Sequence, residues 1–286
     1  MHNQKKTIMS STPDQHNDTL KPIHIDQLFQ SKNPRLAKWI PGFVYRWLSK
    51  LICLDSINDF ISRYGDRKGI DFADAVIEYL NLSFQIEGEE HLPSADGRYI
   101  FVSNHPLGGP DGIILISFLG KKYPELKFPV NDLLLNLKNL NNIFLPVNKH
   151  GGQSRKAVKA IGEAYASNSQ VIMFPAGLCS RKNHGTVKDL TWQKNFVCEA
   201  IRHQRDIVPI HISGQNSNLF YNLANFRKKI GIKANLEMML LPKESFNKKG
   251  ATFTLKIGKP IPWQSLDKTQ KPVETAAAIK EQLYRL

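Results

Sequence analysis

The stretch YIFVSNHPLGGPDG, residues 99–112, joins an apolar run to a loop of histidine, proline, glycine and aspartate. The run is rich in β-branched and aromatic residues, which predicts a buried strand ending near Asn104. Open α/β sheets bind ligands just beyond the carboxyl ends of their strands, and His105 follows this strand directly. A plain surface turn explains Asn-His-Pro and Gly-Gly-Pro-Asp equally well on local grounds. The stretch therefore predicts a strand that leads into either a turn or a site.

Short apolar runs of the same kind recur along the chain, with helical patterns between several of them at 154–167 and 191–205. This alternation predicts an α/β fold with a partly parallel mixed sheet flanked by helices, closed by a helix over about residues 273–286. The expected strands are SFQIEG (83–88), YIFVSN (99–104), FPVND (128–132), NIFLPVN (142–148), QVIMFPAG (170–177), IVPIHISG (207–214), LEMMLLP (236–242) and TFTLKIGKPI (252–261).

The N-terminal part of the sequence predicts an amphipathic helical lead-in. Residues 34–54, PRLAKWIPGFVYRWLSKLICL, carry an apolar stripe with tryptophans beside Lys and Arg, which suits a membrane interface and equally a helix docked on a soluble core. DFADAVIEYLNL (71–82) predicts a second, packing helix. We expect three parts: a tail at 1–22, the helical lead-in at 23–82, and an α/β domain at 83–286.

The formal net charge of +14 indicates an acidic partner: nucleic acid, an anionic membrane surface or an acidic carrier protein. Nucleic acid is disfavoured, because the basic residues come in scattered pairs and no zinc-finger or RNA-binding signature is present. The three cysteines are too few and too scattered for a disulfide framework or a zinc site, which favours a reducing cytoplasm. The polar start of the chain is a poor secretory signal.

The histidine and aspartate of the opening stretch form a candidate catalytic pair. Glycines between them, including Gly108 and Gly109, let the backbone fold tightly and can bring its N–H groups close to a ligand. A carboxylate such as Asp111, bonded to one nitrogen of His105, would fix the tautomer and raise the basicity of the ring. The other ring nitrogen could then take a proton from an attacking hydroxyl or amine of the substrate.

Three further strand ends carry candidate binding residues. Basic residues and a helix start after the strand at 142–148 could hold an anion, although a cap by Ser154 explains the same pattern. After the strand at 170–177, Arg181 could grip an anionic group, whereas Cys179 lacks a neighbouring base in sequence. His211, in the strand at 207–214, has the pattern of a core histidine. The candidate binding residues are Gly108, Gly109, Lys149, Arg155, Phe174, Pro175, Gly177, Ser180, Arg181 and Pro209.

Taken in order, four blocks resemble those of the glycerophosphate and lysophospholipid acyltransferase superfamily: NHPLGGPDG (104–112), LPVNKHGGQSRK (145–156), FPAGLCSRK (174–182) and IVPIHISG (207–214). The resemblance covers residues 85–262, and together with the Ser-Gly-Gln-Asn-Ser segment (213–217) it is greatest to the bacterial ornithine-lipid, glycine-lipid and haemolysin-like branch. Two features depart from the commonest pattern: one extra residue separates His105 from Asp111, and Ala176 stands where that pattern has glutamate.

The resemblance implies transfer of a fatty acyl group from acyl carrier protein or coenzyme A to a hydroxyl or amine of a lysophospholipid or amino-acid lipid. It implies His105 as general base and Asp111 as its orienting partner, with no acyl-enzyme and no metal or further cofactor. Gly177, Ser180 and Arg181 would bind the anionic part of the acceptor, and Pro209 would shape a pocket. The expected location is cytoplasmic, peripheral on the inner face of the cell membrane. The alternative is a non-catalytic lipid-binding or membrane-active, haemolysin-like protein on the same fold.

Overall fold

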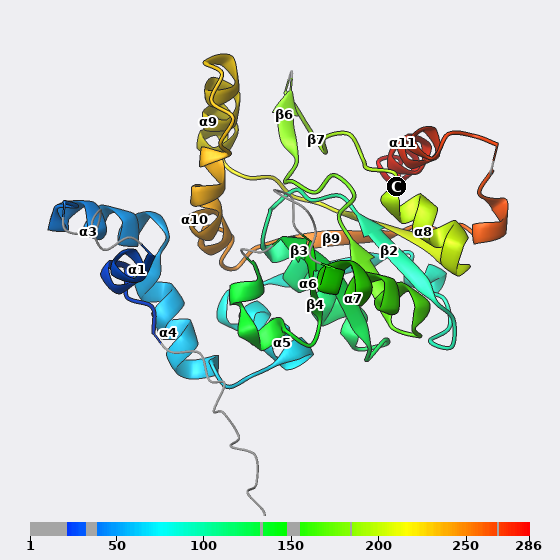
Figure 1. The fold of residues 1–286 in the computed structure, drawn as a ribbon, viewed down its shortest axis with the longest axis horizontal. Helices are drawn as coiled ribbons and strands as arrows, with labels where there is room; N and C mark the ends of the chain where they lie inside the picture. The colour runs from blue at the N-terminus through cyan, green and yellow to red at the C-terminus, as the bar shows by residue number, and fades with distance from the viewer. Residues whose placement is uncertain (1–21, 33–38, 132–133, 148–154, 184, 268) are drawn as a thin grey trace, which may run out of the picture.

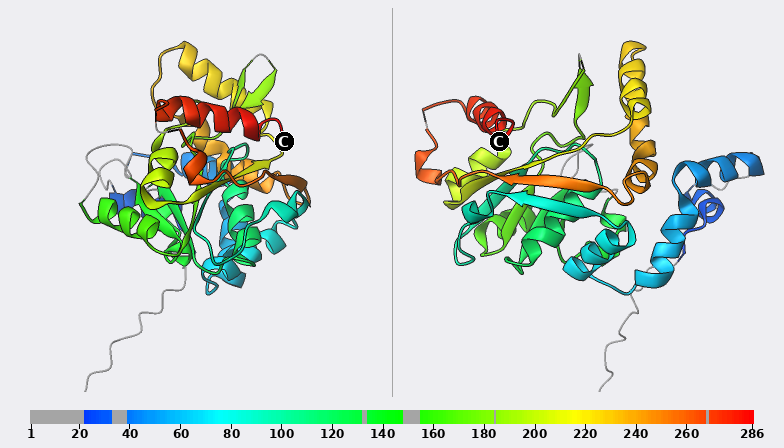
Figure 2. Two further views of the ribbon diagram at one scale, coloured as in Figure 1. Left: turned by 90° about the vertical axis from the view of Figure 1, so that its right-hand side faces the viewer. Right: turned by 180° about the vertical axis from the view of Figure 1, so that it is seen from behind.

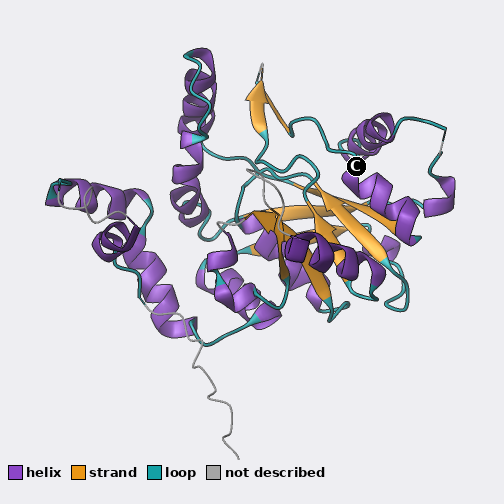
Figure 3. Cartoon of the chain, viewed as in Figure 1, coloured by secondary structure: helices purple, strands orange, loops and turns teal. Residues whose placement is uncertain are grey.

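The computed structural model describes residues 22–32, 39–131, 134–147, 155–183, 185–267 and 269–286 (Figure 1). Helices and strands alternate along most of this length (Figure 3). The α-helices are α1 (Ile25–Lys32), α3 (Gly42–Leu51), α4 (Leu54–Tyr64), α5 (Gly69–Tyr79), α6 (Pro110–Gly120), α7 (Arg155–Ala166), α8 (Asn195–His203), α9 (Asn218–Lys229), α10 (Leu241–Phe246) and α11 (Pro272–Leu283). The strands are β1 (Ser83–Glu87), β2 (Tyr99–Ser103), β3 (Leu126–Asn131), β4 (Phe144–Val147), β5 (Gln170–Met173), β6 (Arg181–Asn183), β7 (Thr186–Lys188), β8 (Asp206–Ile212) and β9 (Thr252–Ile257).

Seven of the strands form one mixed sheet in the order β1-β9-β8-β2-β5-β3-β4. The strands from β8 to β4 are parallel to one another, whereas β9 is antiparallel to β8 and parallel to β1. The predicted α/β fold with a partly parallel sheet is therefore confirmed. The opening stretch forms β2, the central strand of this sheet.

Both faces of β2 are buried, as its uninterrupted apolar run requires. Phe101 points into a core shared with α5 and α6, and its neighbour Val102 points into a second core shared with α8 and α11. Helix α6 is buried around most of its circumference, which explains its sequence of almost unbroken apolar residues after Asp111. The molecule thus has three layers, with the sheet between two sets of helices (Figure 2).

One predicted strand is wrong. LEMMLLP (236–242) forms the 3-10 helix Leu236–Leu240 (η4) and the start of α10. The run has no period-two alternation, and its Glu237 is fully buried and ion-paired to two arginines. The antiparallel hairpin of β6 and β7 was not predicted, because both strands are only three residues long and largely polar.

The lead-in helices differ in how they pack. Helix α3 begins after Pro41, and the large side chains of its region are exposed: Trp39 is 86%, Phe43 65% and Trp47 59% exposed. Helix α5, by contrast, packs on α6 and contributes Phe72 to the core of the sheet. The tail predicted at 1–22 falls almost wholly outside the described residues. The boundary between residues 82 and 83 stays a prediction. In the part of the chain that is described, no helix is both long and apolar enough to span a membrane.

Candidate active site

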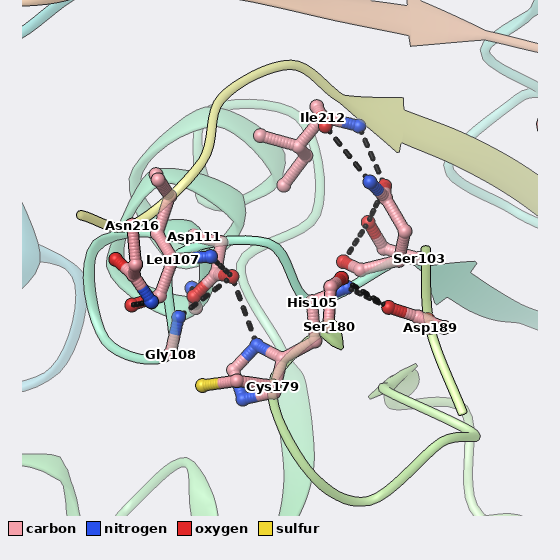
Figure 4. A network of polar contacts seen from close by, with 12 residues as sticks. Ser103, His105, Leu107, Gly108, Asp111, Cys179, Ser180, Asp189, Ile212 and Asn216 are labelled. Atoms are coloured by element: carbon pink, nitrogen blue, oxygen red, sulfur yellow. Dashed lines mark hydrogen bonds and ion pairs between the residues drawn. The ribbon is translucent and has the colours of Figure 1, made fainter. Parts of the chain in front are cut away.

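His105 and Asp111 meet at the carboxyl end of β2, where the chain turns into α6. His105 Nδ1 lies 2.9 Å from Asp111 Oδ2 (Figure 4). Pro110 and Asp111 are the first two residues of α6, so the carboxylate lies at the positive end of the helix. The His105 side chain is 16% exposed and that of Asp111 is fully buried, which leaves the ring as the accessible member of the pair.

Asp111 is held by the backbone as well as by the imidazole. Its Oδ2 accepts the N–H groups of Leu107 at 2.9 Å and Gly108 at 3.1 Å, and its Oδ1 accepts that of Gly112 at 3.0 Å. Burial alone would raise the pKa of this carboxyl, but the charge and hydrogen bond of His105 and the backbone donors outweigh burial and lower its pKa. Asp111 is therefore an ionised acceptor, and His105 donates to it through Nδ1–H, which leaves Nε2 to accept a proton.

Phe174 covers one face of the His105 ring. The two rings are stacked at a centroid distance of 4.0 Å and an interplanar angle of 17°. Phe174 directly follows β5 and packs edge-on against Phe128 of β3, with the ring centroids 5.3 Å apart. Residues from two neighbouring strands therefore hold the ring that stacks on His105. The arrangement fixes the plane of the imidazole in addition to the direction of its Nδ1. Phe174 was predicted as a binding residue, and it lies in direct contact with His105.

Asp189 is a second carboxylate at the site, and the sequence analysis missed it. Its Oδ1 accepts the His105 backbone N–H at 3.1 Å and the Ser180 hydroxyl at 2.6 Å, and its Oδ2 accepts Trp192 Nε1–H at 2.8 Å. Its backbone N–H donates to the hydroxyl of Tyr284 in the C-terminal segment, at 2.8 Å. Asp189 thus ties the His105 loop to the Ser180 and C-terminal segments, and the only signal in the sequence was an acidic residue three positions before a tryptophan.

Gly108 lies against Cys179 inside the same loop. Its φ of +83° is in the left-handed region, and a Cβ at this position would lie 2.2 Å from Cys179 Sγ and 2.8 Å from Leu241 Cδ2. Only glycine fits here without displacement of its neighbours. Burial raises the pKa of the Cys179 thiol well above its usual range, so the thiol stays protonated and packs as an apolar group.

Arg181 is engaged in a buried ion pair. Its guanidinium lies 2.7 Å from Glu237 Oε1, donates to the Cys179 carbonyl at 2.7 Å, and stands over the Phe220 ring at 5.6 Å. The same carboxylate also binds Arg227. The guanidinium of Arg181 thus donates to both Glu237 and the Cys179 carbonyl, and its charge joins β6 to η4.

The remaining predicted binding residues are dispersed. Gly109 precedes α6, where a Cβ would lie 3.1 Å from Ser245 Oγ, and the Ser180 N–H donates to the His105 carbonyl at 2.8 Å. Pro175 is buried, Gly177 is exposed, and Arg155 is exposed at the start of α7. Pro209 is buried within β8, opposite Val102 of β2. Lys149 lies outside the described residues. The structure thus brings Gly108, Gly109, Phe174 and Ser180 to the His105 loop, and places Pro209 within the sheet and Arg155 on the surface.

The site lies in a chain whose family can be assigned. A family model described as acyltransferase matches residues 27–286, and the chain belongs to this acyltransferase family. It is therefore an enzyme that transfers acyl groups. No three His, Cys, Asp or Glu side chains gather as a metal site in the described ranges.

Two similar proteins indicate the branch of the acyltransferases to which the chain belongs. The chain is 44% identical over 270 residues to a lyso-glycine lipid O-acyltransferase from Bacteroides thetaiotaomicron, which covers 94% of this chain and 99% of that protein. It is equally similar to the protein of the same name from Phocaeicola vulgatus, over 94% of this chain and 96% of that protein. These matches confirm the acyltransferase superfamily and its glycine-lipid branch. Among solved structures, the 1-acyl-sn-glycerophosphate acyltransferase PlsC from Thermotoga maritima is similar with a TM-score of 0.45 at 16% identity, covering 84% of this chain and 89% of that one.

Proposed function

We propose that this enzyme transfers a fatty acyl group from an acyl thioester to the hydroxyl of a lyso-glycine lipid. The His105–Asp111 pair carries the proposal, because a buried, ionised carboxylate holds an accessible imidazole in the orientation that a general base needs. The names of the relatives support a glycine-lipid acceptor and ester formation over amide formation.

In this mechanism Nε2 of His105 takes the proton of the acceptor hydroxyl as its oxygen attacks the thioester carbonyl. An ester C–O bond forms and the C–S bond breaks. The proton passes from the imidazolium to the departing thiolate, so the ring returns to its starting state. Asp111 stabilises the transient imidazolium without taking its proton. The reaction needs no nucleophile from the protein, which agrees with the protonated, buried Cys179.

The acyl donor in this proposal is a thioester of acyl carrier protein or of coenzyme A. Both carriers are acidic, so the net charge of +14 favours the binding of either one. We place residues 83–286 as the catalytic domain and residues 23–82 as the lead-in. The exposed Trp39, Phe43 and Trp47 support a peripheral position on a membrane surface, and we assign this position to the cytoplasmic face.

The decisive experiment compares His105→Ala with His203→Ala in acyl transfer from purified acyl thioesters to a lyso-glycine lipid. His203 also pairs with a carboxylate, Glu199 at 3.3 Å, but it lies on α8 and is a matched control. We expect His105→Ala to lower kcat/KM by about 10²–10⁴-fold with the melting temperature preserved, and His203→Ala to retain activity. Full activity of His105→Ala would rule out the mechanism, and vesicle binding without transfer from any thioester would favour a lipid-binding protein.

A further inference from the structure

A large apolar surface outside the active site lies on the α9–η4 hairpin, defined here as residues 218–240. Large apolar side chains are normally buried, and several of them together on one projecting element indicate an interaction site. The exposed members are Leu219 (60%), Phe226 (60%), Ile230 (53%), Ile232 (38%), Leu236 (40%) and Met239 (45%).

Helix α9 has two apolar faces with different roles. Phe220, Tyr221 and Ala224 are buried against the body of the protein. Leu219, Phe226 and Ile230 follow one another at intervals of seven and four residues, so they share a second face, and this face is exposed. Packing within the protein therefore buries only one of the two apolar faces of α9.

The basic residues Lys229 and Lys233 accompany this exposed face, whereas Lys228, two positions from both Phe226 and Ile230, lies on the opposite side of the helix. From Asn218 to Leu236 the sequence has no Asp or Glu, whereas Lys228, Lys229 and Lys233 are all exposed. The next acidic residue, Glu237, is buried and neutralised by two arginines. Lysines at the edge of an apolar helix face are typical of elements that lie at the surface of an anionic membrane.

The hairpin is joined to both the active site and the lead-in. It continues into α10, whose Leu241 lies beside Gly108 of the catalytic loop. Leu51, at the end of α3, packs on the cluster formed by Cys179, Phe220, Tyr221 and Leu240. Helix α9 stands out from the sheet in line with α10, and α3 lies on the same side of the sheet, away from α8 and α11 (Figures 1 and 2).

We infer that the α9–η4 hairpin docks on an anionic lipid bilayer, with Phe226, Ile230 and their apolar neighbours among the headgroups and the lysines on lipid phosphates. The inference rests on the proposed function in one respect: it assigns the membrane that holds the acceptor to a particular face. A bilayer fits better than a compact protein partner, because two separate exposed apolar sets, on α3 and on α9, flank one buried cluster. With both sets docked, the catalytic loop lies near the lipid surface.

The test measures binding of the full chain to vesicles of phosphatidylcholine and to vesicles in which part of this lipid is replaced by phosphatidylglycerol. Phe226→Ser/Ile230→Ser removes apolar contact, and Lys229→Gln/Lys233→Gln removes charge. The matched controls are Val158→Ser/Val273→Ser, which alter valines 52% and 45% exposed on α7 and α11, and Lys194→Gln/Lys259→Gln, which alter exposed lysines elsewhere.

We expect the apolar variant to bind both kinds of vesicle about tenfold more weakly or worse. The lysine variant should lose about tenfold on the anionic vesicles and little on phosphatidylcholine alone. The controls should bind like the wild type. Unchanged binding by both hairpin variants overturns the inference. So does a loss confined to self-association or to binding of purified acyl carrier protein, which would assign the face to a second copy or to the carrier.

Failure of this inference is separable from failure of the proposed function. Transfer by the wild-type protein to a short-chain, water-soluble acceptor, without vesicles, tests the chemistry alone. Transfer in solution combined with unaffected vesicle binding by the hairpin variants removes the docking surface and leaves the function. Vesicle binding through the hairpin, with no acyl transfer from any thioester, supports the docking surface and contradicts the proposed function.

Discussion

Replacement of Gly108 by alanine tests how tightly the His105–Asp111 loop is built. Gly108 has a φ of +83°, and an added Cβ would lie 2.2 Å from Cys179 Sγ and 2.8 Å from a terminal methyl of Leu241. The Gly108 N–H also donates to Asp111, so any shift of this residue moves a partner of the carboxylate that holds His105. The substitution therefore perturbs stability and activity through one backbone position.

The expected loss of stability has two parts. A side chain in the left-handed region costs about 1–2 kcal/mol, and overpacking against a buried neighbour costs about 1–3 kcal/mol. Together they lower the free energy of unfolding by about 2–5 kcal/mol. Because a displacement on the order of 1 Å in a catalytic group can cost about a hundredfold in rate, we expect kcat/KM to fall by about that factor.

Urea unfolding and acyl transfer are measured for Gly108→Ala, Cys179→Ala and the double variant. Removal of Sγ relieves the closest contact but leaves the contact with Leu241 and the backbone strain, so the double-mutant cycle should give a favourable coupling of about 1–2 kcal/mol. Gly162→Ala is the control, since a Cβ within α7 meets nothing within 4 Å, and it should stabilise by about 1 kcal/mol. Wild-type stability and rate in Gly108→Ala, or zero coupling with Cys179→Ala, would refute the reasoning.

The two remaining predictions concern buried carboxylates. The folded-state pKa of Asp111 lies below its unfolded value near 3.8, so its pairing stabilises the fold above that value and the stabilisation is lost as pH falls through the folded pKa. The difference in unfolding free energy between wild type and Asp111→Asn should therefore shrink in acid, and a pH-independent difference contradicts the pairing. Glu237→Gln leaves Arg181 and Arg227 on a neutral amide and should cost about 3 kcal/mol, against about 0.5 kcal/mol or less for the surface-paired Glu163→Gln. Equal melting temperatures of the two glutamine variants would contradict a structural role for the arginine pair.

The strands of the sheet were predictable because each is short, apolar and followed by a turn signal. The run at 99–104 became β2, and the pair His105 and Asp111 could be proposed because both lie within one loop. Phe174 was included on the strength of its motif, and the structure places it on the imidazole ring. The local sequence pattern thus identified His105 and Asp111, which lie in one loop, and the order of the motifs identified Phe174.

The rest depends on contacts between segments distant in sequence. Asp189 is 84 residues from His105, and nothing in its surroundings marks it as a partner of that loop. Arg181 stays a predicted anion-binding residue, and its ion pair with Glu237, 56 residues further on, gave no signal at the strand end. Glu237 lies in the helical turn at Leu236–Leu240, where a strand was predicted from the apolar run alone.

The sheet begins with a strand that has one neighbour, and that neighbour is the last strand. β1 pairs with β9, Ser83 opposite Thr252, and the β9–β8 pairing alone connects this edge to the centre. During synthesis β1 therefore leaves the ribosome long before its partner exists. Until translation has passed β9, the backbone N–H and C=O groups along this edge of β1 have no strand to pair with in the nascent chain, and that interval is when it is most open to pairing with another chain.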